Sequence, residues 1–209
     1  MKAQIKEKLY YLKYSFFHPF DAFYEMRFRG KGSLLIAVIS IVLFGILQCV
    51  RYQYTGFVMN FTEIAAMNSL SVFATWVAGL VLFIVSNWSV TTLLNGKGGM
   101  GDITQVIGYS LVPVELTTIV QIILSNFIIR EEIMIVNVIS GIGIVWFLFM
   151  IVAGLCTIHE YSFGKNIASV ALSFVAAAII IFLGVLFFTL IEKMITFIVD
   201  VVQEFIRRM

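Results

Sequence analysis

Five long apolar runs fill most of this 209-residue chain, and their length limits what it can fold into. The hydrocarbon core of a bilayer is about 30 Å thick and needs roughly 20 apolar residues of a helix to cross it. Because no water in that core can satisfy the backbone, each run must pair its own N–H and C=O groups. We therefore predict an all-α integral membrane protein, a bundle of five transmembrane helices at about 33–50, 70–94, 103–125, 133–156 and 167–191.

Composition supports the same fold class. Hydrophobic residues make up 61% of the chain, charged residues 12%, and the mean hydropathy is +1.01. Soluble domains carry about 25% charged residues, so a water-soluble fold of this composition could not cover its surface. The net charge of +2 is too small to suggest nucleic acid. The expected partner is the lipid bilayer.

The placement of Lys and Arg predicts the orientation, because cytoplasmic segments carry an excess of them. Residues 1–32 hold seven. With this segment inside, Lys97 and Lys165 join them on the inner side, against five on the outer side. The outer five are Arg51, Arg130, Lys193, Arg207 and Arg208. We expect a multi-pass protein of the cell membrane with a cytoplasmic N-terminus and an extracytoplasmic C-terminus.

Both ends of the chain have amphipathic helical patterns. Residues 1–32 predict a cytoplasmic amphipathic arm, residues 33–191 the five-helix domain and residues 192–209 an amphipathic C-terminal helix. In the arm, apolar residues recur at helical spacing, namely Ile5, Leu9, Leu12 and Phe16. Such helices lie in the headgroup plane. The alternative is that the arm packs over the bundle or acts only as a topology signal.

Glu115 is the carboxylate placed well inside an apolar run, roughly 18 Å along the helix from Ile103. A charge at that depth is costly, so the side chain should face the bundle interior and have a partner. Pro113 removes a backbone hydrogen bond and is expected to kink the helix. We predict an intramembrane polar site made of Glu115, Pro113, Tyr109 and Asn87. The alternative is a structural role, with a protonated Glu115 bonded to Asn87, Asn137 or a Thr.

The segment between the second and third runs is rich in glycine, with Gly96, Lys97 and Gly98 at its centre. Backbone N–H groups and a Lys could hold a phosphate, but the spacing of a P-loop is absent and the flanks are membrane helices. A tight turn in which Asp102 caps the next helix is the favoured interpretation. We find no pattern for a catalytic site, a cofactor or a metal, and we expect a protein that is not an enzyme.

Several segments resemble the Yip1 family of five-span membrane proteins, and the bacterial branch in particular. They are Asn87-Trp88, Leu93–Gly98, Gly108–Pro113, His18–Phe23 before the first span and His159–Ser162 before the last. The resemblance covers about 18–192 and implies five spans, with an architectural role for Gly96, Gly98, Tyr109 and Pro113.

What the Yip1 resemblance implies about function differs between branches. Eukaryotic members act with Rab GTPases in vesicle traffic, and many have a long cytoplasmic N-terminal region that this chain lacks. Some bacterial members look like neighbours of carbohydrate ABC-transport systems, which implies an accessory role. The resemblance supplies no catalytic residues.

Three functions follow from these observations. The first is a non-enzymatic scaffold or accessory subunit of a membrane complex, which contacts other membrane proteins or itself through helix faces of small residues. Such faces occur at Ser169, Ser173 and Ala177 and at Gly141 and Gly143. The second is a small oligomeric transporter or channel with Glu115 at its polar site. The third is a membrane-shaping or lipid-handling protein that uses its interfacial helices.

Overall fold

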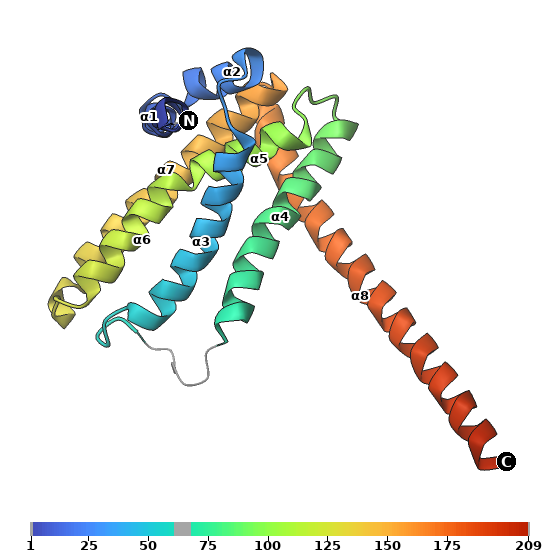
Figure 1. The fold of residues 1–209 in the computed structure, drawn as a ribbon. Coiled ribbons are helices and arrows are strands. Elements are labelled where there is room, and N and C mark those ends of the chain that lie inside the picture. The colour runs from blue at the N-terminus through green and yellow to red at the C-terminus, as the bar shows by residue number, and fades with distance from the viewer. Residues whose placement is uncertain (1, 61–67, 209) are drawn as a thin grey trace.

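A computed structural model describes residues 2–60 and 68–208, with side chains described from Tyr10 onward. It confirms the predicted fold class. The described chain is all-helical, and five of its segments are long and apolar enough to cross a membrane. Figure 1 shows them as a bundle with the two ends of the chain on opposite faces. We call the face that carries the N-terminal helices the arm face and the other the far face.

The elements follow one another in a simple order. Eight α-helices and one 3-10 turn (η2) are described: α1 Lys2–Phe17, α2 Pro19–Arg29, α3 Leu34–Tyr54, α4 Ser69–Leu93, α5 Met100–Ser110, α6 Val112–Ser125, η2 Arg130–Glu132, α7 Ile133–His159 and α8 Phe163–Arg208. The crossing segments are α3, α4, the pair α5–α6, η2–α7 and α8.

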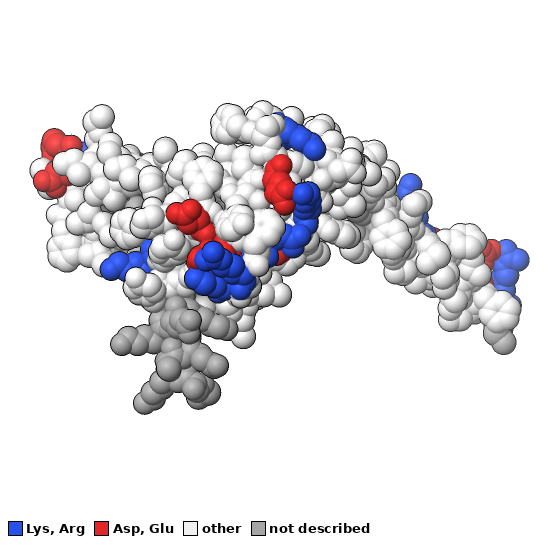
Figure 2. All heavy atoms as spheres, turned by 90° about the horizontal axis from the view of Figure 1, so that it is seen from above, with Lys and Arg blue, Asp and Glu red and all other residues white. Residues whose placement is uncertain are grey.

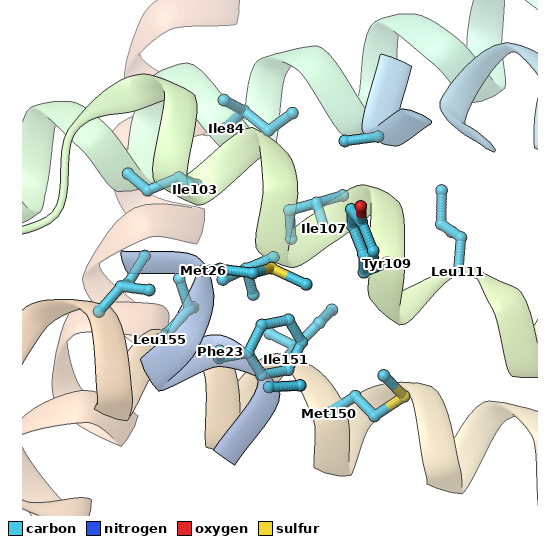
Figure 3. Packing of buried hydrophobic residues seen from close by; sticks show 14 of the residues in the cluster. Phe23, Met26, Ile84, Ile103, Ile107, Tyr109, Leu111, Met150, Ile151 and Leu155 are labelled. Atoms are coloured by element: carbon cyan, nitrogen blue, oxygen red, sulfur yellow. The ribbon is translucent and has the colours of Figure 1, made fainter. Parts of the chain in front are cut away.

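The second helix of the arm packs on the bundle. Pro19 begins α2, and Gly30 ends it at a φ of 63°, a conformation that glycine adopts readily. The inner face of α2 buries Phe23 and Met26 between α5 and α7, as Figure 3 shows. Its outer face leaves Phe20, Tyr24 and Phe28 exposed. Helix α2 therefore packs over the bundle, as in the alternative interpretation of the arm. The side chains of Ile5 and Leu9 lie outside the described residues.

The third span is two helices instead of the single helix expected at 103–125. The break falls at Leu111, and Pro113 lies in the first turn of α6. A proline disfavours the helical conformation of the residue before it and has no N–H to donate, so the ladder stops one turn above it. The predicted effect of Pro113 is therefore present as an interruption of the span.

The last span and the C-terminal segment form one helix, where the sequence suggested a span at 167–191 followed by a separate helix at 192–209. No glycine or proline separates them after Gly184, and Glu192 and Lys193 are good helix formers. The described helix α8 therefore continues to Arg208. In Figure 1 it diverges from the other spans towards the far face.

Helices α3 and α5 pack closely against each other. A Cβ built on Gly108 would lie 2.5 Å from both the Cα and the carbonyl oxygen of Ala37, so only glycine lets these backbones approach so closely. Around this contact, buried apolar side chains from α2, α4, α5 and α7 form one core, seen in Figure 3. The apolar core therefore lies near the arm face.

Candidate functional site

Glu115 is buried and hydrogen-bonded, with 7% of its surface exposed. Its Oε1 lies 2.8 Å from the Ser40 hydroxyl of α3, and the same hydroxyl lies 2.8 Å from the carbonyl oxygen of Gly108. None of the ion pairs among the described residues includes Glu115. Its partner is thus Ser40, and not Asn87, Asn137 or a Thr as the structural alternative supposed.

The helix break supplies the backbone acceptor in this group. The N–H of Leu111 donates to the Ile107 carbonyl at 3.2 Å, and the N–H of Glu115 donates to the Leu111 carbonyl at 2.9 Å. Between these two bonds the helical ladder is interrupted. Pro113 has no N–H for the Tyr109 carbonyl, and the Gly108 carbonyl accepts from Ser40. The site therefore joins α3, α5 and α6 at mid-span.

The structure places the other two predicted residues elsewhere. The Tyr109 hydroxyl accepts the Ser33 N–H at 3.2 Å, and its ring packs edge-on against Tyr11 of the arm. Asn87 faces α8, where its Nδ2 donates to Ser173 Oγ at 3.0 Å. Tyr109 thus ties the third span to the arm, and Asn87 belongs to a separate interface between α4 and α8.

That second interface is lined by small and polar side chains. Ser169 and Ser173 are fully buried, so this small-residue face of α8 is used within the bundle against α4. Gly143 is also used internally, since an added Cβ would lie 2.1 Å from Thr117. Gly141 has nothing within 4 Å of such a Cβ, so its face remains open.

An open crevice lies between the far-face ends of α3 and α6. It is lined by Val50, Gln53, Tyr54, Thr55, Gly56, Phe57, Ile122, Ile123, Asn126 and Phe127. The Gly56 N–H donates to Ser125 Oγ at 2.9 Å beside it. Its lining does not include Glu115, which lies about two turns deeper along α6.

The glycine loop packs directly on the end of α7. The Gly98 N–H donates to Nδ1 of His159 at 3.2 Å, and Lys97 pairs with Glu160. A Cβ on Gly96 would lie 2.6 Å from the His159 ring, so the loop needs glycine there to approach it. The segments Gly96–Gly98 and His159–Glu160, distant in sequence, form one cluster in the fold.

Tyr161 closes this cluster from the other side. Its hydroxyl lies 3.2 Å from the Leu94 carbonyl and 3.3 Å from the Thr91 carbonyl, at the end of α4. Lys165 donates to the Leu94 carbonyl at 2.9 Å and lies over the Tyr161 ring, 4.1 Å from its centroid. Burial raises the pKa of the Tyr161 phenol. These contacts fix the turn between α4 and α5.

Arg27 attaches the arm to the same loop. Its Nη1 pairs with Asp102 at 2.6 Å, and its Nη2 donates to the Lys97 carbonyl. Asp102 also accepts the Gly99 N–H at 2.8 Å, as expected of a residue that caps the start of α5. Figure 2, which looks down on the arm face, shows acidic and basic side chains side by side there. The charges are thus paired with each other around the loop.

A further carboxylate on the arm holds two cations. Glu25 accepts from Lys31 at 3.0 Å and from Arg29 at 2.8 Å. The hydrogen bond from Lys31 and the charges of Lys31 and Arg29 lower the pKa of the Glu25 carboxyl. The pairs therefore persist until the pH falls through this lowered value.

The raised pKa of Tyr161 predicts a loss of stability in alkali. As the pH rises, the phenol of Tyr161 ionises in the unfolded chain before it ionises in the folded protein. Its contribution to the free energy of unfolding is therefore fully present below the unfolded pKa of about 10 and is lost as the pH rises through the higher folded pKa. We expect the midpoint of thermal unfolding in detergent to fall over this range, and to fall less in Tyr161→Phe. The exposed Tyr54→Phe is the control. An equal fall in the wild type and Tyr161→Phe would contradict the assignment.

A family model described as the Yip1 domain matches residues 13–186, which is most of the chain. The chain belongs to the Yip1 family. No curated protein and no solved structure matched it. The Yip1 match begins in α1 and ends inside α8, so the arm from Lys13 onward and all of the bundle belong to the Yip1 domain, while the end of α8 lies beyond it.

The Yip1 resemblance of separate segments has a spatial explanation. His18–Phe23, Leu93–Gly98 and His159–Ser162 all lie at the arm face, where the loop packs on α7 and α2 packs across both α7 and α5. Gly108–Pro113 forms the break in the third span. Sequence reasoning missed Ser40 and Arg27. The available signal for Ser40 was a hydroxyl within an apolar run.

Proposed function

We propose that this Yip1-family protein is a non-enzymatic scaffold or accessory subunit of a membrane complex, and that α8 is the surface it offers to its partner. The observation that carries the proposal is the exposure of α8. No residue in its most apolar stretch is buried, and the buried residues of the helix, Asn166, Ser169 and Ser173, all lie near its start.

The length of α8 strengthens the argument. Its 46 residues rise roughly 69 Å at 1.5 Å each. A helix tilted by about 40°, the upper end of the usual range, needs about 39 Å to cross a 30 Å core. Roughly 30 Å of α8 therefore extends past the hydrocarbon core, including the part from Glu192 onward where charges return.

This outer part of α8 has an apolar face that nothing in the described chain covers. Ile195, Ile198 and Phe205 are more than half exposed, while Thr196 and Gln203 lie on the opposite side of the helix. Because this outer part continues the spanning helix α8 without a break, it cannot lie flat on the membrane surface. A partner helix or domain at the far face would cover the apolar side. The first partner to look for is the permease of a carbohydrate ABC-transport system, as the resemblance to bacterial members suggests.

The experiment is affinity purification from gently solubilised native membranes, followed by mass spectrometry. The wild type should bring down a stoichiometric membrane partner. The double variant Ile198→Glu/Phe205→Glu places two charges on the apolar face. Strong interface residues each contribute about 2 kcal/mol to the binding free energy, so recovery of the partner should fall by more than about tenfold. The cause would be the cost of burying an unpaired carboxylate.

Thr196→Glu/Gln203→Glu is the matched control, since it adds the same charge to the polar face of the same turns. It should leave recovery unchanged. Equal recovery with both variants would show that the apolar face binds no partner. Recovery of the wild type without a stoichiometric membrane protein would contradict the proposed function.

A further inference from the structure

The hydroxyl of Ser40 stands between two oxygen atoms but has one hydrogen. It lies 2.8 Å from the Gly108 carbonyl and 2.8 Å from Glu115 Oε1, and both are hydrogen-bond distances. A serine hydroxyl donates once and can accept as well. A carbonyl cannot donate. Both bonds can therefore exist together when Ser40 donates to Gly108 and a protonated Glu115 donates to Ser40.

An ionised Glu115 would change this arrangement. Two acceptors would compete for the single Ser40 proton, and the charged carboxylate would win because bonds to ionised groups are stronger. The Gly108 carbonyl, already outside the helical ladder, would then lack a donor in a buried place, which is unfavourable. The protonation state of Glu115 thus decides whether Ser40 of α3 is bonded to the break between α5 and α6.

The described residues around Glu115 include little that could hold it in its ionised form. On α3 the first ionisable side chains lie towards or beyond its ends, Lys31 on one side and Cys49 and Arg51 on the other. The neighbouring helices contribute tyrosines near the arm, Tyr11, Tyr14 and Tyr109. On α7 they are Cys156 and His159, at its arm-face end, where His159 accepts from Gly98. No cation among the described residues is paired with Glu115.

We propose that Glu115 is a proton-binding site and that the break in the third span responds to whether the proton is bound. With the proton, a chain of hydrogen bonds runs from Glu115 through Ser40 to Gly108 and holds α6, α3 and α5 together. When the O–H bond of Glu115 breaks, the proton passes to water, Ser40 turns to the carboxylate, and the contact of α3 with the break loosens. This inference depends on neither the scaffold role nor the partner of α8.

Infrared spectroscopy of the protein in lipid bilayers tests proton binding. Subtracting Glu115→Gln from the wild type at neutral pH should leave a carboxylic acid C=O band that shifts in D₂O. Subtracting Glu192→Gln, a matched change on α8, should leave none. In Ser40→Ala the band should remain and move to higher frequency, because Glu115 loses its acceptor. Absence of the band in the wild type would overturn the proposal.

Hydrogen–deuterium exchange tests the response of the break. Raising the pH until the band disappears should increase the exchange rate of amides in 107–115, relative to the intrinsic rate at that pH, by an order of magnitude. Glu115→Gln donates to Ser40 at every pH and should show no such increase. Equal behaviour of the two proteins would overturn the coupling. If Glu115→Gln does not insert, the band shift in Ser40→Ala decides, and an unshifted band rejects the site.

Discussion

Gly108→Ala is expected to destabilise the bundle by about 3 kcal/mol or more, the upper end of the range for overpacking, because the clash is with backbone. The added Cβ would lie 2.5 Å from the Cα and the carbonyl oxygen of Ala37. No rotamer can relieve that contact, so α3 must move away from α5 and the Ser40 bond to the Gly108 carbonyl must lengthen. The measurement is the fraction folded in mixed micelles as the denaturing detergent increases.

Gly141→Ala and Gly184→Ala are the controls for Gly108→Ala. Both glycines lie inside spanning helices, and nothing lies within 4 Å of a Cβ added to either. Alanine is the better helix former by about 0.8–1 kcal/mol in water, so these variants should be unchanged or slightly more stable. The sign of the effect therefore differs between Gly108 and its controls. A stabilising Gly108→Ala would show that α3 and α5 are not in close contact.

The number and type of spans could be predicted from the sequence because the bilayer sets a length that each apolar run meets separately. That inference needs no tertiary contact, and all five runs correspond to crossing segments. The ends of the helices were harder to place. Helix α8 continues through Glu192 because no residue there stops a helix. The charged residues that begin at Glu192 resemble the end of a membrane span, but the helix does not end there.

The candidate site could be predicted only in part, for a similar reason. Glu115 and Pro113 stand out locally, since each is unusual within an apolar run. Ser40 does not, because one hydroxyl in a span normally bonds to its own helix. The role of Ser40 depends on how α3 and α5 are aligned along their lengths. The close approach of the two helices at Gly108 fixes this alignment, and no local sequence pattern predicts it. The predicted neighbours of Asn87 are wrong for the same reason, because its hydrogen-bond partner is Ser173 of α8.

Gly96→Ala tests the cluster at the arm face and is expected to cost about 2 kcal/mol. The new Cβ would lie 2.6 Å from Nδ1 of His159, 2.8 Å from the Tyr161 hydroxyl and 2.9 Å from Cβ of Thr91. His159 is 1% exposed and cannot swing aside, so the loop must rise off α7 and lose the Gly98 bond. Thermal unfolding and the rate of proteolysis at Lys97 would report the change.

Gly99→Ala provides the matched change in the same loop, since its Cβ would meet only Asp102 at 3.6 Å, an ordinary contact. It should be nearly neutral. Adding Tyr161→Phe to Gly96→Ala removes the hydroxyl at 2.8 Å and should recover part of the loss, so the two changes together cost less than their sum. Additive losses would mean that Gly96 and Tyr161 do not touch. The Yip1 glycine motif would then need an explanation other than close packing of the loop on α7.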